Sequence, residues 1–144
     1  MDPEDVYNLD ESGLFFRLLP TKFYSFANES RFGGKQLKNR VTLVFISNAS
    51  GTDKQVIFIG RSASPHAFRG LNSLPLDYYN QKNAWIDSEI FNKILQRLNK
   101  KMQKNNQKIM LYIDCCPAHR IERQFDNISV KYLPKNSTSK LQVI

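Results

Sequence analysis

Two aspartates in this sequence stand at the ends of short apolar runs. Asp10 ends "VYNLD" at positions 6–10, and Asp114 ends "KIMLYID" at positions 108–114. Carboxylates a few ångströms apart repel each other unless a proton or a metal ion lies between them, and hard oxygen ligands suit Mg²⁺ or Mn²⁺. If both runs are strands and the strands are adjacent, the two carboxylates project from neighbouring strand ends. We therefore predict that Asp10 and Asp114 share a divalent cation site.

A site of this kind suits chemistry on phosphodiesters. Mg²⁺ keeps several waters and takes few protein ligands, so a sparse carboxylate set is enough when substrate phosphates complete the coordination shell. In two-metal catalysis one ion activates the attacking water or 3′-hydroxyl group, and the other stabilises the leaving oxygen. For either aspartate taken alone, the structural alternative is a turn former or a helix cap.

The residues that follow Asp114 offer a second set of possible ligands. Cys115 and Cys116 are neighbours, which disfavours a disulfide between them, so we expect two reduced thiols. A zinc site made of these cysteines and His119 would match no familiar ligand spacing and would lack an evident fourth ligand. For His119 we favour a surface or helix-start histidine over a metal ligand.

Composition and charge limit the classes of function. The chain has 144 residues, of which 41% are hydrophobic, enough for one globular domain with a core. Lys and Arg number 21 against 13 Asp and Glu, a formal charge of +8, which favours a polyanionic partner such as nucleic acid. No apolar stretch approaches the ~20 residues needed to cross a bilayer. The acidic N-terminus does not resemble a signal peptide, so an intracellular protein is expected.

The first half of the chain reads as strands and loops. A strand over residues 5–10 is expected to lead into a turn at Gly13, and "LFFRLLP" (14–20) predicts a short strand or a packed turn. The polar segment 27–40 predicts an exposed loop. The runs 41–47 and 55–59, joined by "NASGTD", predict an antiparallel hairpin.

The second half predicts a helix between strands. Residues 61–83 show no clean period and are expected to be irregular. Asp87 can cap a helix whose apolar residues recur at the spacing of one buried face. These residues are Ile90, Phe91, Ile94, Leu95, Leu98 and Met102. The near-continuous apolar character of 108–114 predicts a central parallel strand buried on both faces.

The remaining segments complete a mixed α/β sheet. "PAHRIERQF" (117–125) predicts a helix or loop and 128–134 a strand, and the polar residues from Lys135 to Lys140 could open a last helix. An antiparallel section followed by strand, helix and strand predicts helices packed against the faces of a mixed sheet.

Aromatic and basic residues have simple structural interpretations. Trp85, Phe91 and Phe45 are expected in the core. The second group is expected either in the core or as stacking platforms for bases: Phe15, Phe16, Tyr78 and Tyr79. The basic run from Lys93 to Lys108 is interpreted as a solvated helix face in preference to a DNA track.

Five ordered segments resemble one known family. "NLDESGLFFRLLP", "LVFISNASGTDKQVIFIG", "AWIDSEIFNKIL", "KIMLYIDCCPAH" and "VKYLPKNSTSKLQ" are similar to the landmark segments of the DDE endonuclease domain of pogo and Tigger type transposases, shared by the Jerky and centromere protein B families. The resemblance covers residues 1–144. It implies an RNase H-like fold, Mg²⁺- or Mn²⁺-dependent DNA strand transfer or nuclease activity, and a nuclear location. It also implies that Asp10 and Asp114 are the first and second catalytic aspartates, with His119 in a supporting role.

The sequence departs from the family pattern at three places. Cys115 stands where the family usually has asparagine. The third acidic residue, expected just after the segment that reads here Leu141, Gln142, Val143, Ile144, does not appear, and neither does an N-terminal helix-turn-helix region. We therefore expect a domain incomplete at its C-terminus, with its last helix missing and its activity impaired. The alternatives are a non-catalytic nucleic-acid-binding or interaction module, and a fragment without a stable fold.

Overall fold

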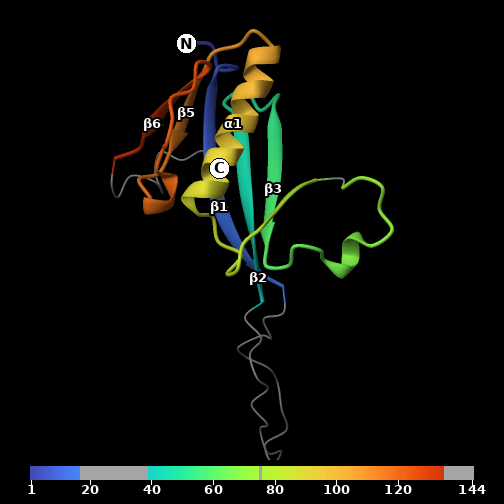
Figure 1. Ribbon diagram of the computed structural model, residues 1–144. Coiled ribbons are helices and arrows are strands. Elements are labelled where there is room, and N and C mark those ends of the chain that lie inside the picture. Colours follow the sequence, from blue (N-terminus) through green and yellow to red (C-terminus); the bar gives the residue numbers. More distant parts are fainter. Residues whose placement is uncertain (17–38, 75, 135–144) are drawn as a thin grey trace, which may run out of the picture.

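The computed structural model describes residues 1–16, 39–74 and 76–134 (Figure 1). In these ranges six strands form one sheet in the order β4-β3-β2-β1-β5-β6. The elements are β1 (Val6–Phe15), β2 (Arg40–Asn48), β3 (Lys54–Gly60), the 3-10 helix η1 (His66–Phe68), β4 (Asp77–Asn80), α1 (Ser88–Lys104), β5 (Ile109–Ile113), the 3-10 helix η2 (Pro117–His119) and β6 (Ile128–Tyr132).

The sheet is mixed, as predicted from the sequence. β1, β2 and β3 are antiparallel neighbours, whereas β5 is parallel to β1 and β6 is parallel to β5. The predicted hairpin of β2 and β3 is confirmed, and its turn is held by the Asn48 side chain, which accepts from Asp53 N and donates to Thr52 Oγ1. Gly51 supplies the positive φ of 72° that this turn requires. Three antiparallel strands followed by parallel ones are the arrangement that the predicted RNase H-like fold implies.

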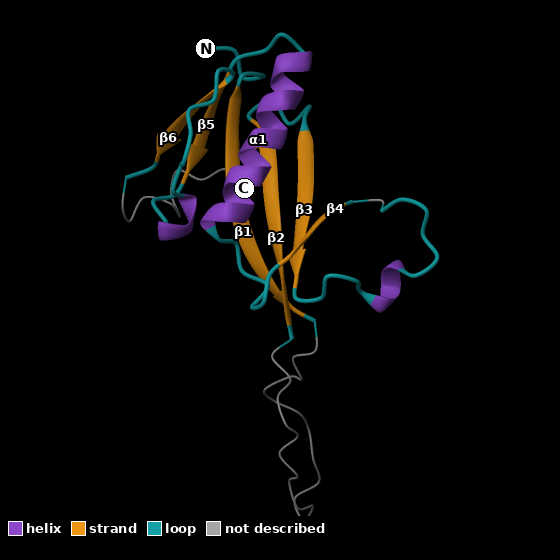
Figure 2. Cartoon of the chain, viewed as in Figure 1, coloured by secondary structure: helices purple, strands orange, loops and turns teal. Residues whose placement is uncertain are grey.

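Helix α1 lies across one face of the sheet (Figure 2). Asp87 caps it by accepting a hydrogen bond from Ile90 N at 2.9 Å, as predicted. Every residue of the predicted apolar face is buried, against Leu9 and Leu111 of the sheet among others. Each such fully buried Leu, Ile or Phe side chain contributes roughly 1.5–3 kcal/mol of transfer free energy. Among the described residues, α1 is the one helix longer than three residues, and no helix is long and apolar enough to span a membrane.

Several boundaries differ from the prediction. β1 does not end at Asp10 or turn at Gly13, because it keeps pairing with β2 as far as the Phe15–Arg40 pair. In β5 burial alternates instead of covering both faces, since Ile109, Leu111 and Ile113 are buried and the residues between them are half-buried. The segment 61–83 contains η1 and the edge strand β4, which lacked a periodic signal.

Other expectations have mixed outcomes. The segment 117–125 forms the short η2 and a loop, and the strand at 128–134 is confirmed as the shorter β6. Most of the predicted loop 27–40, and the possible last helix from Lys135, lie outside the described residues, as does 14–20 beyond residue 16.

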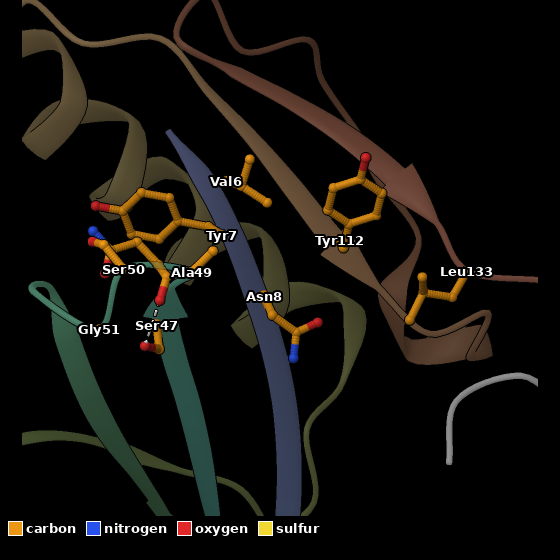
Figure 3. Close-up of a pocket in the computed structure, with 10 residues that line it drawn as sticks. Val6, Tyr7, Asn8, Ser47, Ala49, Ser50, Gly51, Tyr112 and Leu133 are labelled. Carbon is orange, nitrogen blue, oxygen red and sulfur yellow. Dashed lines mark hydrogen bonds between the residues drawn. The ribbon is translucent and has the colours of Figure 1, made fainter. Parts of the chain in front are cut away.

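A cavity of about 490 Å³ lies on the sheet face opposite α1 (Figure 3). Val6 and Asn8 of β1, Tyr112 of β5 and Leu133 contribute to its largely apolar wall. No carboxylate from the described residues lines it, so this cavity is separate from the acidic residues considered next.

Candidate metal centre

The strands that carry Asp10 and Asp114 are adjacent and parallel. Their last paired residues are Asn8 and Tyr112, so two further residues along each strand lead to Asp10 and Asp114. The predicted adjacency of the two strands is therefore confirmed. Asp10 Oδ1 accepts a hydrogen bond from Glu11 N at 2.9 Å. That the two carboxylates share one ion stays a prediction.

Glu11 is an acidic residue on the opposite face of β1 from Asp10, because successive strand residues alternate between faces. It pairs with Val44, whose side chain is fully buried in the core beneath α1. A carboxylate on such a face needs a partner to offset its lost hydration. Glu11 Oε1 lies 2.5 Å from His119 Nε2, and this contact joins residues 108 positions apart.

His119 is completely buried, so the expectation of a surface or helix-start histidine is wrong. Its ring lies 4.8 Å from the ring of Phe91 in α1. Its backbone carbonyl accepts a hydrogen bond from Tyr132 Oη at 2.7 Å. The side chain of Asn92 fixes the next residues by donating to Arg120 O and accepting from Glu122 N. Contacts from α1 and β6 therefore hold the histidine in place.

The second ring nitrogen of His119 faces Asp114. Nδ1 makes a hydrogen bond of 3.1 Å with the Asp114 carbonyl oxygen and lies 2.6 Å from Asp114 Oδ1. Burial by itself lowers the pKa of His119, but the hydrogen bond and charge of Glu11, with smaller contributions from Asp114, outweigh it and raise the pKa. A protonated imidazole would face two carboxylates, leaving the group with an excess of negative charge.

Asp114 Oδ1 faces His119 Nδ1 as an ion pair but without hydrogen-bond geometry. It is buried and, despite its proximity to His119 Nδ1, has no hydrogen-bond partner within the described part of the chain. A buried carboxylate oxygen is costly unless a donor or a cation compensates its charge. The hard oxygen atoms of Asp114 are ligands of the kind that Mg²⁺ and Mn²⁺ prefer, so this carboxylate, with its uncompensated oxygen, fits a divalent cation.

Glu11, Asp114 and His119 also offer one ligand atom each within 4.8 Å of one another. Both ring nitrogens of His119 already face oxygen atoms, of Glu11 and of Asp114. We therefore interpret the histidine as a residue that holds these two carboxylates in position, and we assign the role of metal ligand to the carboxylates. Cys115 is exposed and Cys116 half-buried, and both are free thiols as predicted. Among the described residues neither cysteine joins an acidic or histidine cluster, which disfavours the zinc alternative.

Glu11 and His119 were not recognised as partners from the sequence. One signal was available: strand alternation places Glu11 on the same face as Leu9 and Tyr7, which are buried. A charged residue in that phase indicates a polar partner inside the protein. Nothing local to either residue identifies His119 as that partner, because 107 residues separate them.

Comparison with known proteins defines the class of this domain. The model of the DDE superfamily endonuclease family matches residues 38–144. The chain is 34% identical to Tigger transposable element-derived protein 4 of Mus musculus, over 92% of this chain and 26% of that protein. It is 33% identical to the Jerky protein of Mus musculus, over 99% of this chain and 27% of that protein.

Two further similarities complete the comparison. CENP-B homolog protein 2 of Schizosaccharomyces pombe is 34% identical over 95% of this chain and 28% of its own length. The solved Mos1 transposase paired-end complex with left transposon end aligns with a TM-score of 0.44 and 12% identity, over 83% of this chain and 31% of the Mos1 chain. The chain spans about a quarter of the length of the three relatives named.

The chain belongs to the DDE superfamily endonuclease family. Within that family, its relatives place it with the transposase-derived domains of the pogo and Tigger type, as the sequence resemblance indicated.

Proposed function

We propose that Asp10 and Asp114 bind a divalent cation, Mg²⁺ or Mn²⁺, at which a DNA phosphodiester is held for hydrolysis or strand transfer. The observation that carries this proposal is the pairing of β1 with β5, which leads to both aspartates two residues beyond the Asn8–Tyr112 pair. Family membership supports the choice of phosphodiester chemistry.

The protein groups have distinct tasks in this proposal. Asp10 and Asp114 supply oxygen ligands, and the contacts from Glu11 through His119 fix the orientation of Asp114. The bound ion would polarise a phosphate oxygen and lower the pKa of a coordinated water. The excess of basic residues over the whole chain would attract the polyanionic substrate in a salt-dependent way.

Calorimetric titration with Mn²⁺ tests the metal site. We expect Asp10→Asn and Asp114→Asn each to weaken Mn²⁺ binding by at least about tenfold, because each removes a charged ligand. Asp126→Asn is the matched control, since Asp126 is exposed and lies before β6. Unchanged Mn²⁺ affinity in both active-site variants would defeat the proposal, provided that each variant melts cooperatively.

A non-catalytic nucleic-acid-binding module is the second candidate. It is favoured by the contact between His119 and Asp114, because a protonated imidazole can compensate the carboxylate without a metal ion. This candidate predicts salt-sensitive DNA binding in EDTA and no nicking when Mn²⁺ is added. Nicking that disappears in Asp114→Asn would refute it.

A nuclear location is proposed for the same reason as a DNA substrate. The relatives include a transposable element-derived protein and a CENP-B homolog. Imaging of the tagged chain in cells tests this proposal, and exclusion from the nucleus would contradict it.

A further inference from the structure

Trp85 is the one tryptophan in the chain, and it is not in the core as its residue type suggested. The residue is 55% exposed, in the segment between β4 and α1. Phe15, at the end of β1, is 43% exposed. Arg40 Cζ lies 4.1 Å from the Trp85 ring centroid and 5.8 Å from that of Phe15. Two exposed aromatic rings therefore share one guanidinium group.

Arg40 is held in place by groups that do not neutralise its charge. Its Nε donates to Thr42 Oγ1 at 3.1 Å, and the same hydroxyl donates to Ala84 O at 2.6 Å. Thr42 is buried, so one hydroxyl group fixes both Arg40 and the residue before Trp85. The guanidinium also lies close over Gly13, where a Cβ atom would stand 3.0 Å from Cζ and Nε. Arg40 is thus preorganised on the surface of β1.

The segment that carries Trp85 is fixed as well. Gln81 Oε1 accepts hydrogen bonds from Asn83 N at 2.6 Å and Trp85 N at 3.3 Å. Arg61 Nε donates to Lys82 O at 3.1 Å. Ala84 is buried with a φ of 54°, a conformation that a non-glycine residue keeps only when its surroundings enforce it.

These elements line an open pocket of about 260 Å³ with a defined chemical character. Its lining comprises Phe15, Arg40, Arg61, Asn83 and Trp85, with no acidic residue among the described residues. Each arginine anchors itself through Nε, and within the described structure no hydrogen bond or ion pair engages the terminal nitrogens of either one. Terminal guanidinium nitrogens are the groups that bind phosphate in bidentate fashion.

We propose that Phe15, Arg40, Arg61 and Trp85 form a binding site for single-stranded DNA, in which an unpaired base stacks on Trp85 and the arginines hold an adjacent phosphate. Aromatic rings interleaved with cations are the combination that binds single strands with little sequence preference. An acidic peptide would use the arginines but not the rings. The exposed ring faces and the terminal guanidinium nitrogens are accessible to such a ligand.

The position of this site extends the proposed function, on which its biological role rests. Asp10 and Phe15 lie on the same strand, and five residues at about 3.3 Å each separate them by roughly 16 Å. That distance is close to five base steps of about 3.4 Å. Strand alternation places Phe15 on the face of β1 that carries Glu11, so DNA bound at Trp85 would lie within about five base steps of the cluster of Glu11, His119 and Asp114. The site would then hold a strand that is unpaired near the reacting phosphate.

Fluorescence titration in EDTA tests the binding site without any contribution from metal. Because Trp85 is the sole tryptophan, we expect saturable quenching by a single-stranded oligonucleotide and weaker quenching by an abasic strand of equal length. Poly-glutamate of comparable charge should give neither quenching nor tight binding. Quenching by poly-glutamate equal to that by DNA would instead assign the surface to an acidic protein partner.

Variants separate a binding role from a structural one. With a labelled single strand, anisotropy should report about a tenfold loss of affinity for Trp85→Ala and for Arg40→Gln. Arg123→Gln is the matched control, since Arg123 is exposed and carries the same charge. Gly13→Ala crowds the Arg40 side chain while keeping its charge, and should also weaken binding.

Two outcomes would overturn the inference. If Trp85→Ala and Arg40→Gln lower the melting temperature but leave affinity for single strands unchanged, the Arg40 contact is only structural. If Arg123→Gln weakens binding as much as Arg40→Gln, attraction is nonspecific. The result is independent of the metal site, because Mn²⁺ affinity in the aspartate variants is measured without DNA.

Discussion

Two polar clusters lie on the same face of β1, beneath α1, and they differ in how their charges are compensated. Tyr7 belongs to the first, where its hydroxyl donates to Asp53 at 2.8 Å and Lys101 Nζ lies 2.7 Å from both oxygens of the same carboxylate. Glu11 belongs to the second, with His119 and Asp114. Tyr7 and Glu11 are four positions apart along the strand.

The first cluster is balanced and the second is not. In the first, one carboxylate faces one ammonium group, and donors reach both oxygens. In the second, two carboxylates face one imidazole, and Asp114 Oδ1 has no hydrogen bond within the described residues. A cluster whose positive and negative charges cancel needs no further partner. A cluster with an excess of carboxylates is stabilised when it binds a cation. The contrast supports a structural role for Asp53 and agrees with the binding role proposed for Asp114.

Removal of His119 should have the largest effect. We expect His119→Ala to lower the free energy of unfolding by about 3 kcal/mol, because it leaves two carboxylates without their buried partner. Urea denaturation measures the change, with His66→Ala, an exposed histidine, as control. A loss below about 1 kcal/mol would mean that Glu11 and Asp114 are hydrated in the folded protein. The two clusters would then not differ in charge compensation as described.

Removal of Lys101 should have a smaller effect that depends on pH. Burial raises the pKa of Asp53, but hydrogen bonds from Lys101 and Tyr7 outweigh it, and the net pKa is lowered. Stability from Asp53 is therefore complete above the unfolded pKa of about 3.9 and is lost as the pH falls through the lower folded value. Lys101→Met should cost about 1 kcal/mol at pH 7, discounted because Lys101 is 39% exposed.

The pH profile of unfolding distinguishes this role from simple packing. Below about pH 4, Lys101→Met should lose stability less steeply than the parent protein, since the Asp53 pKa is then nearer its unfolded value. Lys100→Met, at an exposed neighbouring position, should follow the parent profile. Parallel profiles for all three proteins would contradict the assignment of Asp53.

The smallest expected effects come from two hydroxyl groups. Tyr7→Phe removes a donor to Asp53, which Lys101 still satisfies, so we expect a loss of roughly 0.5–1 kcal/mol. Tyr132→Phe removes the donor to His119 O, but Tyr132 is 47% exposed and water can replace it, so its loss should be smaller still. Thermal unfolding measures both variants. A larger loss of stability for Tyr132→Phe than for Tyr7→Phe would contradict this prediction.

Much of the scaffold could be predicted because its signals are local. Asp87 and the apolar residues that follow it specify α1 within a few turns, and "NASGTD" specifies the hairpin of β2 and β3. The apolar run that ends at Asp114 predicted a parallel strand beside β1, which the structure confirms. Each of these features depends on residues close together in the sequence.

The remaining features depend on contacts between distant residues. Glu11 meets His119 only because β1 and η2 converge in the fold, so no spacing in the sequence reveals the pair. Trp85 was expected in the core by residue type, yet Gln81 and the positive φ of Ala84 hold it outside. β1 was predicted too short because the pairing that extends it to Phe15 comes from β2.

Helix α1 touches both clusters, through Phe91 near its first turn and Lys101 near its last. An apolar helix face alone tolerates sliding along its own axis, because one turn later, about 5.4 Å away, a similar row of side chains is presented. The ring contact of Phe91 with His119 and the ion pair of Lys101 with Asp53 oppose such a shift, since it would break both contacts together. The helix is thereby held in register with the sheet near both ends, and its contact with His119 helps to position the imidazole that faces Asp114.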